Sequence, residues 1–268
     1  KLENGEIELD DMVIASKNAS GMGGSQIYLE TGEKMTVRDL IKGITMASAN
    51  DATVAMAEYI SGTEKKFVEL MNKKVKDLGL KNTYFKNCTG LDEDGHYSSA
   101  YDMAVIARHL IMEHSDIIKF SSVYEDYLRE DTDNKFWLVN TNKLVRFYEG
   151  ADGLKTGHTD NAGYCLAATS KRNGLRLIAI VLGEPSASVR NNETMELLNY
   201  GYQNLRINNL FQVIKELDML DICVFDSSLA IFNISDNVLF VNFNEHNISL
   251  ILSQISPIVI VSGITSNN

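Results

Sequence analysis

Two short polar motifs in this sequence carry side chains that could bind an anionic or carbonyl ligand. Ser48-Ala49-Asn50 offers a hydroxyl and an amide, and Lys155-Thr156-Gly157 offers an ammonium, a hydroxyl and a residue without a side chain. A cation and a hydroxyl on an extended segment suit a carboxylate or an oxyanion, and the glycine lets the main chain of a ligand lie alongside. Each motif alone also fits an ordinary turn or helix cap, so the pair is more specific than either member.

The first motif lies between two segments with helical periodicity. Apolar residues recur at helical spacing over 37–46 and again over 52–59. A junction between two helices can present the hydroxyl of Ser48 and the amide of Asn50 to one cleft. The alternative is that Asn50 or Asp51 merely caps the second helix.

The second motif lies at the start of a predicted antiparallel meander. Strands are expected at 153–158, 162–170 and 175–183, with reversals at Asp160-Asn161 and Lys171–Gly174. This arrangement places Lys155 on the first strand. A helix is expected from Arg190 to Tyr202, and without further information Arg190 could be a surface residue at the helix start.

The order of the two motifs matches a known pattern. Ser-x-Asn followed about a hundred residues later by Lys-Thr-Gly is found in penicillin-binding proteins and class A β-lactamases. The sequence resembles the low-molecular-weight penicillin-binding proteins of the D-alanyl-D-alanine carboxypeptidase family, over roughly residues 1–205. His158, directly after Lys-Thr-Gly, favours carboxypeptidases over β-lactamases. The flanking segments that share this likeness are Met22–Leu29, Ala47–Ala52, Phe85–Leu91, Gly95–Asp102, Asn140–Leu144 and Asp152–Thr159.

The resemblance implies a fold and an activity. The fold would be the α/β (α+β) penicillin-binding/β-lactamase-like transpeptidase fold, an antiparallel sheet with helices. The activity would be removal of the terminal D-alanine from the peptidoglycan pentapeptide through a serine ester, and β-lactams would be trapped by the same serine. Such a protein would act outside the cytoplasm, secreted or associated with the cell envelope.

The resemblance also implies roles for individual residues. Ser48 would relay a proton to the leaving amine, Asn50 would bind the peptide carbonyl, and Lys155 would stabilise developing charge. The substrate would be held by four further residues, of which the arginine would help to bind its terminal carboxylate: Thr156, Gly157, His158 and Arg190.

The sequence departs from the family pattern in its nucleophile. No serine among the 268 residues is followed three positions later by a lysine, and Thr31 with Lys34 has this spacing only within a predicted turn. We expect that about the first fifth of the catalytic domain, with its Ser-x-x-Lys, is missing upstream of Lys1, and that the polypeptide as given is inactive. Two alternatives are a catalytically dead peptidoglycan-binding module and a class A-like β-lactamase.

Composition narrows the remaining functional classes. With 36 acidic and 25 basic residues the net charge is −11, which disfavours binding of nucleic acid. The 3 cysteines and 5 histidines form no metal-binding pattern, so no metal and no cofactor are expected. No apolar run reaches the roughly 18–20 residues of a membrane span, and 255–268 lacks the basic face of an amphipathic anchor. Membrane association would therefore require segments outside this sequence.

The chain is predicted to form two domains. A catalytic domain is expected over 1–205, and a small β-rich domain over 206–268, with strands near 222–225, 229–234, 238–243 and 258–261. In the first domain a short strand is expected at 26–30. Thr36, Thr63 and Ser99 are expected to cap helices.

Overall fold

The computed structural model describes residues 1–204, 230–232, 240–244, 247–251 and 258–263. The chain forms two compact units. The first comprises Lys1–Ser98 and Lys119–Asn142, and the second comprises Ser99–Ile118 and Lys143–Asn268. The chain therefore passes from one unit to the other three times.

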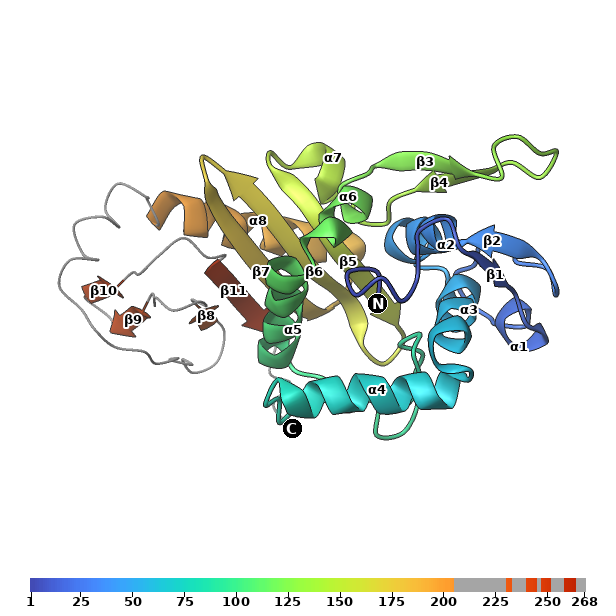
Figure 1. Ribbon diagram of the computed structural model, residues 1–268. Helices are drawn as coiled ribbons and strands as arrows, with labels where there is room; N and C mark the ends of the chain where they lie inside the picture. Colours follow the sequence, from blue (N-terminus) through green and yellow to red (C-terminus); the bar gives the residue numbers. More distant parts are fainter. Residues whose placement is uncertain (205–229, 233–239, 245–246, 252–257, 264–268) are drawn as a thin grey trace. The chain divides into compact units, whose positions relative to one another are not determined.

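The first unit combines short strand pairs with helices (Figure 1). β1 (Met12–Ile14) pairs antiparallel with β2 (Lys34–Thr36), and β3 (Glu125–Leu128) pairs antiparallel with β4 (Phe136–Val139). The helical elements are α1 (Lys17–Ser20), α2 (Val37–Lys42), one π-helical turn η1 (Gly43–Ala47), α3 (Asn50–Ser61) and α4 (Glu64–Asp77), and the short α6 (Ile118–Ser121) begins at the boundary with the second unit.

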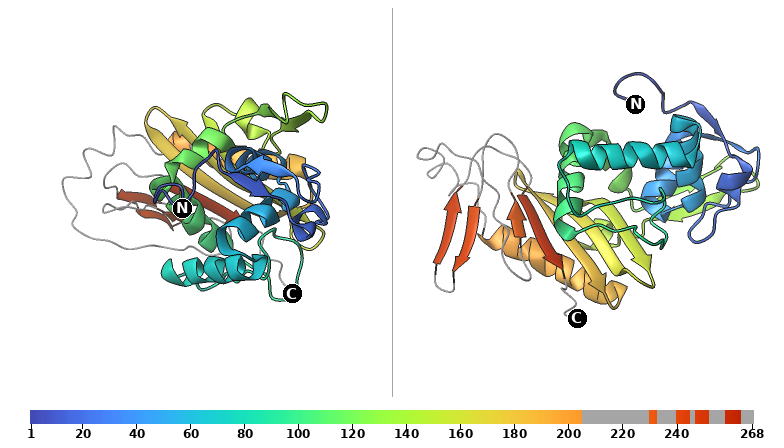
Figure 2. Two further views of the ribbon diagram at one scale, coloured as in Figure 1. Left: turned by 45° about the vertical axis from the view of Figure 1, so that its right-hand side comes forward. Right: turned by 90° about the horizontal axis from the view of Figure 1, so that it is seen from below.

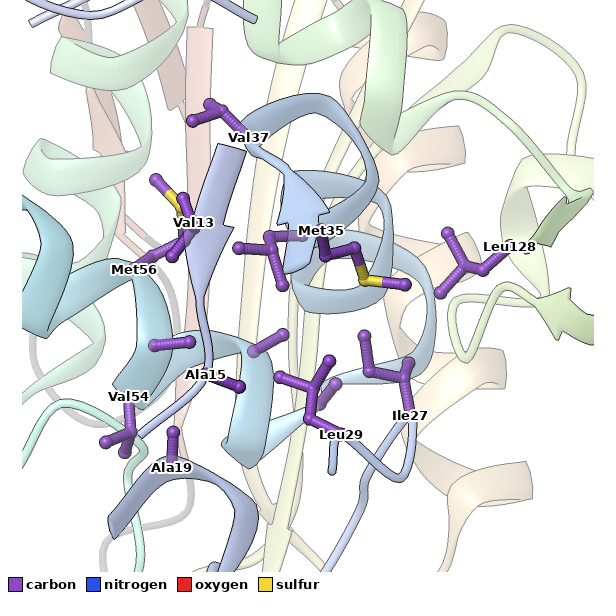
Figure 3. Packing of buried hydrophobic residues seen from close by; sticks show 14 of the residues in the cluster. Val13, Ala15, Ala19, Ile27, Leu29, Met35, Val37, Val54, Met56 and Leu128 are labelled. Atoms are coloured by element: carbon purple, nitrogen blue, oxygen red, sulfur yellow. The ribbon is translucent and has the colours of Figure 1, made fainter. Parts of the chain in front are cut away.

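A single apolar cluster fills the first unit (Figure 3). In β1 the side chain of Val13 is buried whereas its two neighbours are exposed, as expected for a strand with one covered face. Its partner in the ladder, Met35 of β2, is buried as well. Helix α3 contributes Val54 and Met56 to the same cluster, so packing of its apolar face against this cluster holds α3 in position.

The predicted helix caps are confirmed. The hydroxyls of Thr36, Thr63 and Ser99 each accept a hydrogen bond from the main-chain N–H three residues later, at 3.1, 3.2 and 3.2 Å. These bonds satisfy donors that the first helical turn leaves unpaired. Gly79 follows α4 with a φ of +68°, the usual left-handed end of a helix.

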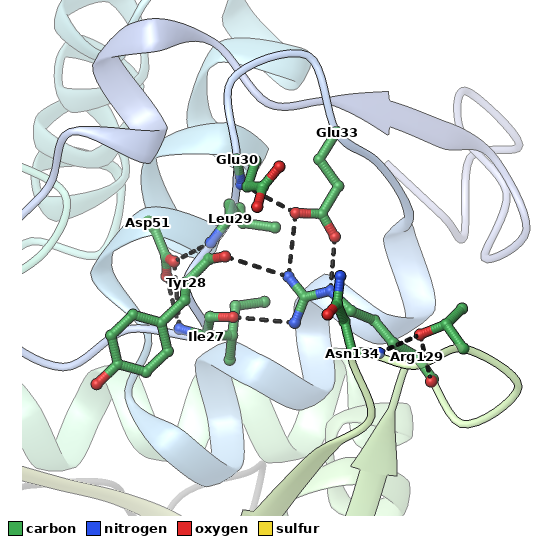
Figure 4. A network of polar contacts seen from close by, with 9 residues as sticks. Ile27, Tyr28, Leu29, Glu30, Glu33, Asp51, Arg129 and Asn134 are labelled. Carbon is green, nitrogen blue, oxygen red and sulfur yellow. Dashed lines mark hydrogen bonds and ion pairs between the residues drawn. The ribbon is translucent and has the colours of Figure 1, made fainter.

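The predicted strand at 26–30 is wrong. The N–H groups of Ile27 and Leu29 donate to the buried carboxylate of Asp51 instead of to a neighbouring strand (Figure 4). Tyr28 between them has a φ of +59°, which no regular strand tolerates. The apolar side chains of Ile27 and Leu29 make the sequence strand-like, but the carboxylate of Asp51 binds the N–H groups that a neighbouring strand would bind.

The second unit is built on a five-stranded sheet with the order β5-β6-β7-β11-β8. β5 (Ala151–Thr159), β6 (Gly163–Arg172) and β7 (Leu175–Glu184) form the predicted antiparallel meander. β11 (Ile258–Gly263) runs parallel to β7, and β8 (Ala230–Phe232) is antiparallel to β11. The other elements are α5 (Ala100–Glu113), η2 (Ser115–Ile117), α7 (Leu144–Phe147), α8 (Ala187–Asn204) and the hairpin of β9 (Phe240–Asn244) with β10 (Asn247–Ile251).

Helices cover both faces of this sheet (Figures 1 and 2). Leu177 and Ala179 of β7 pack in one cluster with Leu198 of α8, whereas Ile178 and Ile180 pack in another cluster with residues of α5. Consecutive residues of a strand point to opposite faces, so the uninterrupted apolar run of β7 requires a cover on each side.

Part of the predicted C-terminal region lies outside the described residues. The strand expected at 222–225 falls there, while β8, β9 and β11 overlap the strands expected at 229–234, 238–243 and 258–261. The predicted domain boundary near residue 205 stays a prediction, because most of 206–268 is not described. Among the described residues, no helix combines the length and the apolar character needed to cross a lipid bilayer.

We predict that substitution on either face of β7 destabilises the protein. Leu177→Ala and Ile178→Ala each remove a fully buried side chain, and each should cost about 2–5 kcal/mol of unfolding free energy because the core cannot collapse onto the space left behind. The control is Leu70→Ala in α4, where the leucine is 46% exposed and the cost should stay within about 0.5 kcal/mol. Urea unfolding measures all three, and equal costs for the buried and exposed leucines would contradict the assignment of the core.

Candidate active site

The first motif lies at the predicted helix junction. Ser48 ends η1 in a left-handed conformation, with φ of 60° and ψ of 36°, and α3 begins two residues later. Two main-chain bonds hold this turn: the N–H of Ala49 donates to the carbonyl of Gly43 at 3.1 Å, and the N–H of Thr141 donates to the carbonyl of Met46 at 2.9 Å. A left-handed serine is uncommon and marks a turn that its surroundings enforce.

Asn50 is buried and bound to the segment that precedes the predicted 26–30 strand. Its main-chain N–H donates to the carbonyl of Ser25 and its Nδ2 donates to the carbonyl of Gly23, both at 2.8 Å. A Cβ at Gly24 would lie 2.7 Å from Nδ2 of Asn50, so only glycine fits there. The alternative that Asn50 or Asp51 is the N-cap of α3 is wrong, since the N-cap is Ala49, whose side chain makes no capping bond.

The second motif lies on β5, which is one of the two edge strands of the sheet among the described pairings. Lys155 faces Ala167 in the register with β6, and its Nζ donates to the carbonyl of Thr156 at 2.8 Å. Burial, and after it the positive charge of Arg190, lowers the pKa of Lys155 to about 8. An ammonium with such a pKa is still mostly charged at neutral pH and is stabilised by a nearby anion.

Arg190 belongs to the same group. It lies in the first turn of α8, is only 5% exposed, and donates from Nε and Nη2 to Oδ1 of Asn191 at 3.1 and 2.9 Å. Burial lowers the pKa of its guanidinium, which remains charged. The reading of Arg190 as a surface residue at the helix start is therefore wrong. Helix α8 begins at Ala187, earlier than predicted, because the hydroxyl of Ser186 accepts a bond from the N–H of Val189 at 3.2 Å.

The end of β5 is exposed to solvent at Gly157 and His158. The imidazole is exposed and lies against the ring of Tyr164 on β6, with 4.0 Å between ring centroids and 34° between planes. Gly157 faces Cys165 in the ladder, and a Cβ at Gly157 would be in ordinary contact with Cβ of Cys165 at 3.7 Å. Burial raises the pKa of the Cys165 thiol, which makes it a poor nucleophile at neutral pH.

An ion pair fixes the start of β5. Asp152 is the extra residue where the register between β5 and β6 shifts, between the pairs that Ala151 and Gly153 make. Its carboxylate accepts two bonds from Arg176 of β7, at 2.8 and 2.7 Å, and the same guanidinium donates to the hydroxyl of Thr169 on β6 at 2.8 Å. A one-residue slip would exchange the faces of Lys155 and its neighbours, and this three-strand connection opposes such a slip.

The predicted site residues fall into two groups. Ser48 and Asn50 are placed together in the first unit, and the other five are placed together in the second unit: Lys155, Thr156, Gly157, His158 and Arg190. Nothing in the sequence indicates that four charged residues hold these groups in place: Asp51, Arg129, Asp152 and Arg176. Within the part of the chain that the structure describes, no group of three or more His, Cys, Asp or Glu residues could hold a metal ion.

We predict that the stability contributed by Lys155 rises with pH. The unfolded chain keeps this proton up to the ordinary value of 10.5, whereas the folded chain keeps it only up to about 8. Between these values the unfolded state binds more protons, so the unfolding free energy should increase with pH across this window. Urea unfolding at several pH values, compared with Lys155→Met, isolates this effect. Equal slopes for the two proteins would contradict the lowered pKa.

We predict strong coupling between Asp152 and Arg176. Asp152→Ala or Arg176→Ala alone leaves a partly buried charge without its partner and should cost about 2–3 kcal/mol. The double substitution should cost clearly less than the sum, with a coupling energy of about 1 kcal/mol or more. A double-mutant cycle by urea unfolding measures this, with the exposed pair Arg38 and Asp10 as a control that should show little coupling. Additive costs at Asp152 and Arg176 would contradict the structural role.

Comparison with known proteins identifies the family. The family model described as D-alanyl-D-alanine carboxypeptidase matches residues 1–186. The D-alanyl-D-alanine carboxypeptidases DacF of Bacillus subtilis and DacA of Escherichia coli are 54% and 39% identical over 211 and 225 residues, which cover 79% and 84% of this chain but only 54% and 55% of theirs. The chain thus spans about half the length of these relatives.

Solved structures agree with the sequence match. Penicillin binding protein 5 of Haemophilus influenzae is similar with a TM-score of 0.71 at 31% identity, over 97% of this chain and 70% of that one. The carboxypeptidase DacD of Francisella tularensis gives the same TM-score at 28% identity, over 97% and 71%. The predicted fold class is confirmed. With the Ser-x-Asn and Lys-Thr-Gly motifs in place, this chain belongs to the D-alanyl-D-alanine carboxypeptidase family.

Proposed function

We propose that this chain supplies the substrate-binding part of a serine-type D-alanyl-D-alanine carboxypeptidase. The observation that carries the proposal is the cationic group on the edge strand, where the charge of Arg190 acts on Lys155 of the Lys-Thr-Gly motif. A half-buried lysine and a buried arginine in one group favour an anionic ligand, because an anion offsets both their desolvation and their mutual repulsion. The terminal carboxylate of a D-alanyl-D-alanine peptide has the required charge.

The strand itself suits a peptide ligand. β5 is an edge strand, so an extended stem peptide can add to the sheet through main-chain hydrogen bonds. Gly157 has no side chain to obstruct this approach, while Thr156 offers a hydroxyl and His158 an exposed ring. We assign these three residues to substrate binding, together with Arg190 for the carboxylate.

We also assign roles in this reaction to two polar residues of the first unit. We assign to Asn50 the binding of the peptide carbonyl and to Ser48 the relay of a proton to the departing amine. In the reaction a serine hydroxyl attacks the carbonyl between the two D-alanines and gives its proton to a base. The C–N bond breaks as the amine takes a proton, D-alanine leaves, and water hydrolyses the resulting ester. Lys155 stabilises the negative charge that develops.

We propose that the nucleophile is not among the residues of this sequence. No serine is followed three positions later by a lysine. Thr31, which has this spacing to Lys34, shares a hydrogen bond of 2.6 Å between its hydroxyl and that of Ser20. We therefore propose that this polypeptide alone binds the substrate without turnover. The lack of a Ser-x-x-Lys also favours a second candidate function, a peptidoglycan-binding module without catalysis. The family match favours either of these over a β-lactamase.

We also propose the ligands of the protein and its location in the cell. Peptidoglycan pentapeptides and β-lactams would be its ligands, the reaction would belong to the peptidoglycan chemistry that determines cell shape, and the protein would be secreted or attached to the cell envelope. The net charge of −11 argues against nucleic acid as a partner.

Covalent labelling by a fluorescent penicillin tests the proposal. We compare this chain with a version that carries an N-terminal Ser-x-x-Lys segment, and read the label by mass on the intact protein. Label should appear only on the extended version, and Lys155→Ala in that version should lower the acylation rate by about 100-fold or more, as expected for loss of a charge that stabilises the oxyanion.

The control is Lys34→Ala, which changes an exposed lysine of β2 and should label at the unmodified rate. Label on this chain would show that a serine or threonine within 1–268 is reactive and would contradict the missing nucleophile. Absence of label from both versions would contradict penicillin binding, and full labelling of Lys155→Ala would contradict the role of Lys155.

A further inference from the structure

Charged side chains bind the middle of the segment from Gly23 to Glu33 (Figure 4), whereas Gly32 and Glu33 at its end bond through the main chain to Ala15. On one side lies Asp51, which directly follows Asn50 and is fully buried. On the other side lies Arg129, whose side chain is mostly buried. Neither residue belongs to the groups assigned above to binding or proton relay.

Asp51 uses both carboxylate oxygens on main-chain donors. Oδ2 accepts from the N–H of Leu29 at 2.9 Å, Oδ1 accepts from the N–H of Ala52 at 2.8 Å, and the N–H of Ile27 donates to both oxygens at 3.1 and 3.2 Å. A buried carboxylate is tolerated only where such donors replace its water. The carboxylate thereby ties the first turn of α3 to the segment.

Arg129 binds the same segment through its carbonyl groups. Its guanidinium donates to the carbonyl of Ile27 at 3.0 Å and to that of Tyr28 at 3.4 Å, and forms a two-bond ion pair with Glu33 at 2.6 and 3.1 Å. The carboxylate of Glu33 also accepts from the N–H of Glu30 at 2.9 Å. Ile27 is therefore bound at its N–H by Asp51 and at its carbonyl by Arg129.

Unfavourable backbone conformations gather around this network. Four non-glycine residues have a positive φ among the described residues, and three of them are Tyr28, Ser48 and Arg129. Two of the three belong to the network itself, and Ser48 lies three residues before Asp51. Left-handed conformations of this kind persist only where the surrounding structure enforces them, and they are enriched at functional sites.

The segment also determines the position of Asn50. The carbonyls of Gly23 and Ser25, which accept both bonds of Asn50, lie directly before the residues that Asp51 and Arg129 bind. If the segment moved, the side-chain amide of Asn50 would lose its acceptor. The turn at Ser48 is continuous with the same end of α3.

We propose that Asp51 and Arg129 are positioning residues that hold Ser48 and Asn50 in the geometry needed for acyl transfer. The functional part rests on the proposed carboxypeptidase function; the structural part does not. The two side chains bind opposite polar groups of one peptide segment, and that segment in turn holds the amide of Asn50 and the left-handed turn of Ser48.

Asp51→Asn tests the structural part on this chain. The variant keeps the volume but sets an NH2 donor against main-chain donors. Amide hydrogen exchange by NMR should become at least tenfold faster at Ile27, Leu29 and Asn50, while the amides of β6 and β7 should exchange at the unmodified rate. The matched control is Asp10→Asn, an exposed carboxylate of the same unit, which should change none of them. Unchanged exchange at Asn50 in Asp51→Asn would overturn the proposal.

Arg129→Lys tests the other side. Lysine keeps the charge but cannot bind Glu33 and two carbonyls at once, so exchange at Ile27 and Asn50 should again become faster. Arg38→Lys, at an exposed arginine, is the control. Equal exchange rates in Arg129→Lys and Arg38→Lys would overturn the role of Arg129.

Acylation by penicillin tests the functional part in the version with the Ser-x-x-Lys segment. At a temperature at which each variant is folded, Asp51→Asn should lower the acylation rate constant at saturating penicillin at least tenfold and change the half-saturating concentration little. If Asp51 had only a structural role, Asp51→Asn would lower the fraction of protein that is acylated but leave the acylation rate constant of that fraction unchanged. That result would overturn the proposal. If the unmodified extended version is not acylated, the carboxypeptidase function fails, and the exchange measurements still decide the positioning role.

Discussion

The burial of the central residues of β7 on both faces is the constraint on which the second unit depends. Each side chain from Leu177 to Val181 is fully buried, so the sheet needs a helix on each side, and α8 and α5 supply them. The position of α8 then brings Arg190, in its first turn, close to Lys155 of β5. Burial of apolar side chains thus determines which charges lie near the edge strand.

The first unit positions its polar residues by a different physical means. Its apolar cluster fixes α3, but the turn at Ser48 and the side chain of Asn50 depend on charged groups that bind the main chain. Such bonds are directional and lose much of their value when one partner is displaced. The geometry of this group should therefore respond more sharply to single polar substitutions than that of the sheet.

Periodicity and local chemistry in the sequence predicted most of the regular structure. The helix junction at Ser48, the three capping hydroxyls and the antiparallel meander all follow from patterns within about twenty residues. The same reasoning failed for 26–30, because its strand-like composition contains no sign that Asp51 would replace a neighbouring strand. Helix α8 also begins three residues earlier than its apolar pattern predicts, because the hydroxyl of Ser186 caps it.

The motifs of the proposed site can be read from the sequence, but the residues that hold them in place cannot. Ser48, Asn50 and Lys155 lie in short motifs that can be read directly. The residues that hold them are far away in the chain: the ion pair of Arg129 with Glu33 spans 96 positions, and that of Arg176 with Asp152 spans 24. A single sequence contains no signal for such pairs, because each charge alone is equally compatible with a solvated surface.

The three passages of the chain between the two units have a consequence for synthesis on the ribosome. The first unit needs residues 119–142, so its apolar cluster lacks Leu128 and Leu138 until that stretch has emerged. By then α5 has already been made, while the strands that cover its apolar face come later. At typical elongation rates of about 5–20 residues per second, this helix waits several seconds for its sheet. During that interval the apolar side of α5 stays uncovered, and transiently exposed surfaces of this kind are the ones that chaperones protect.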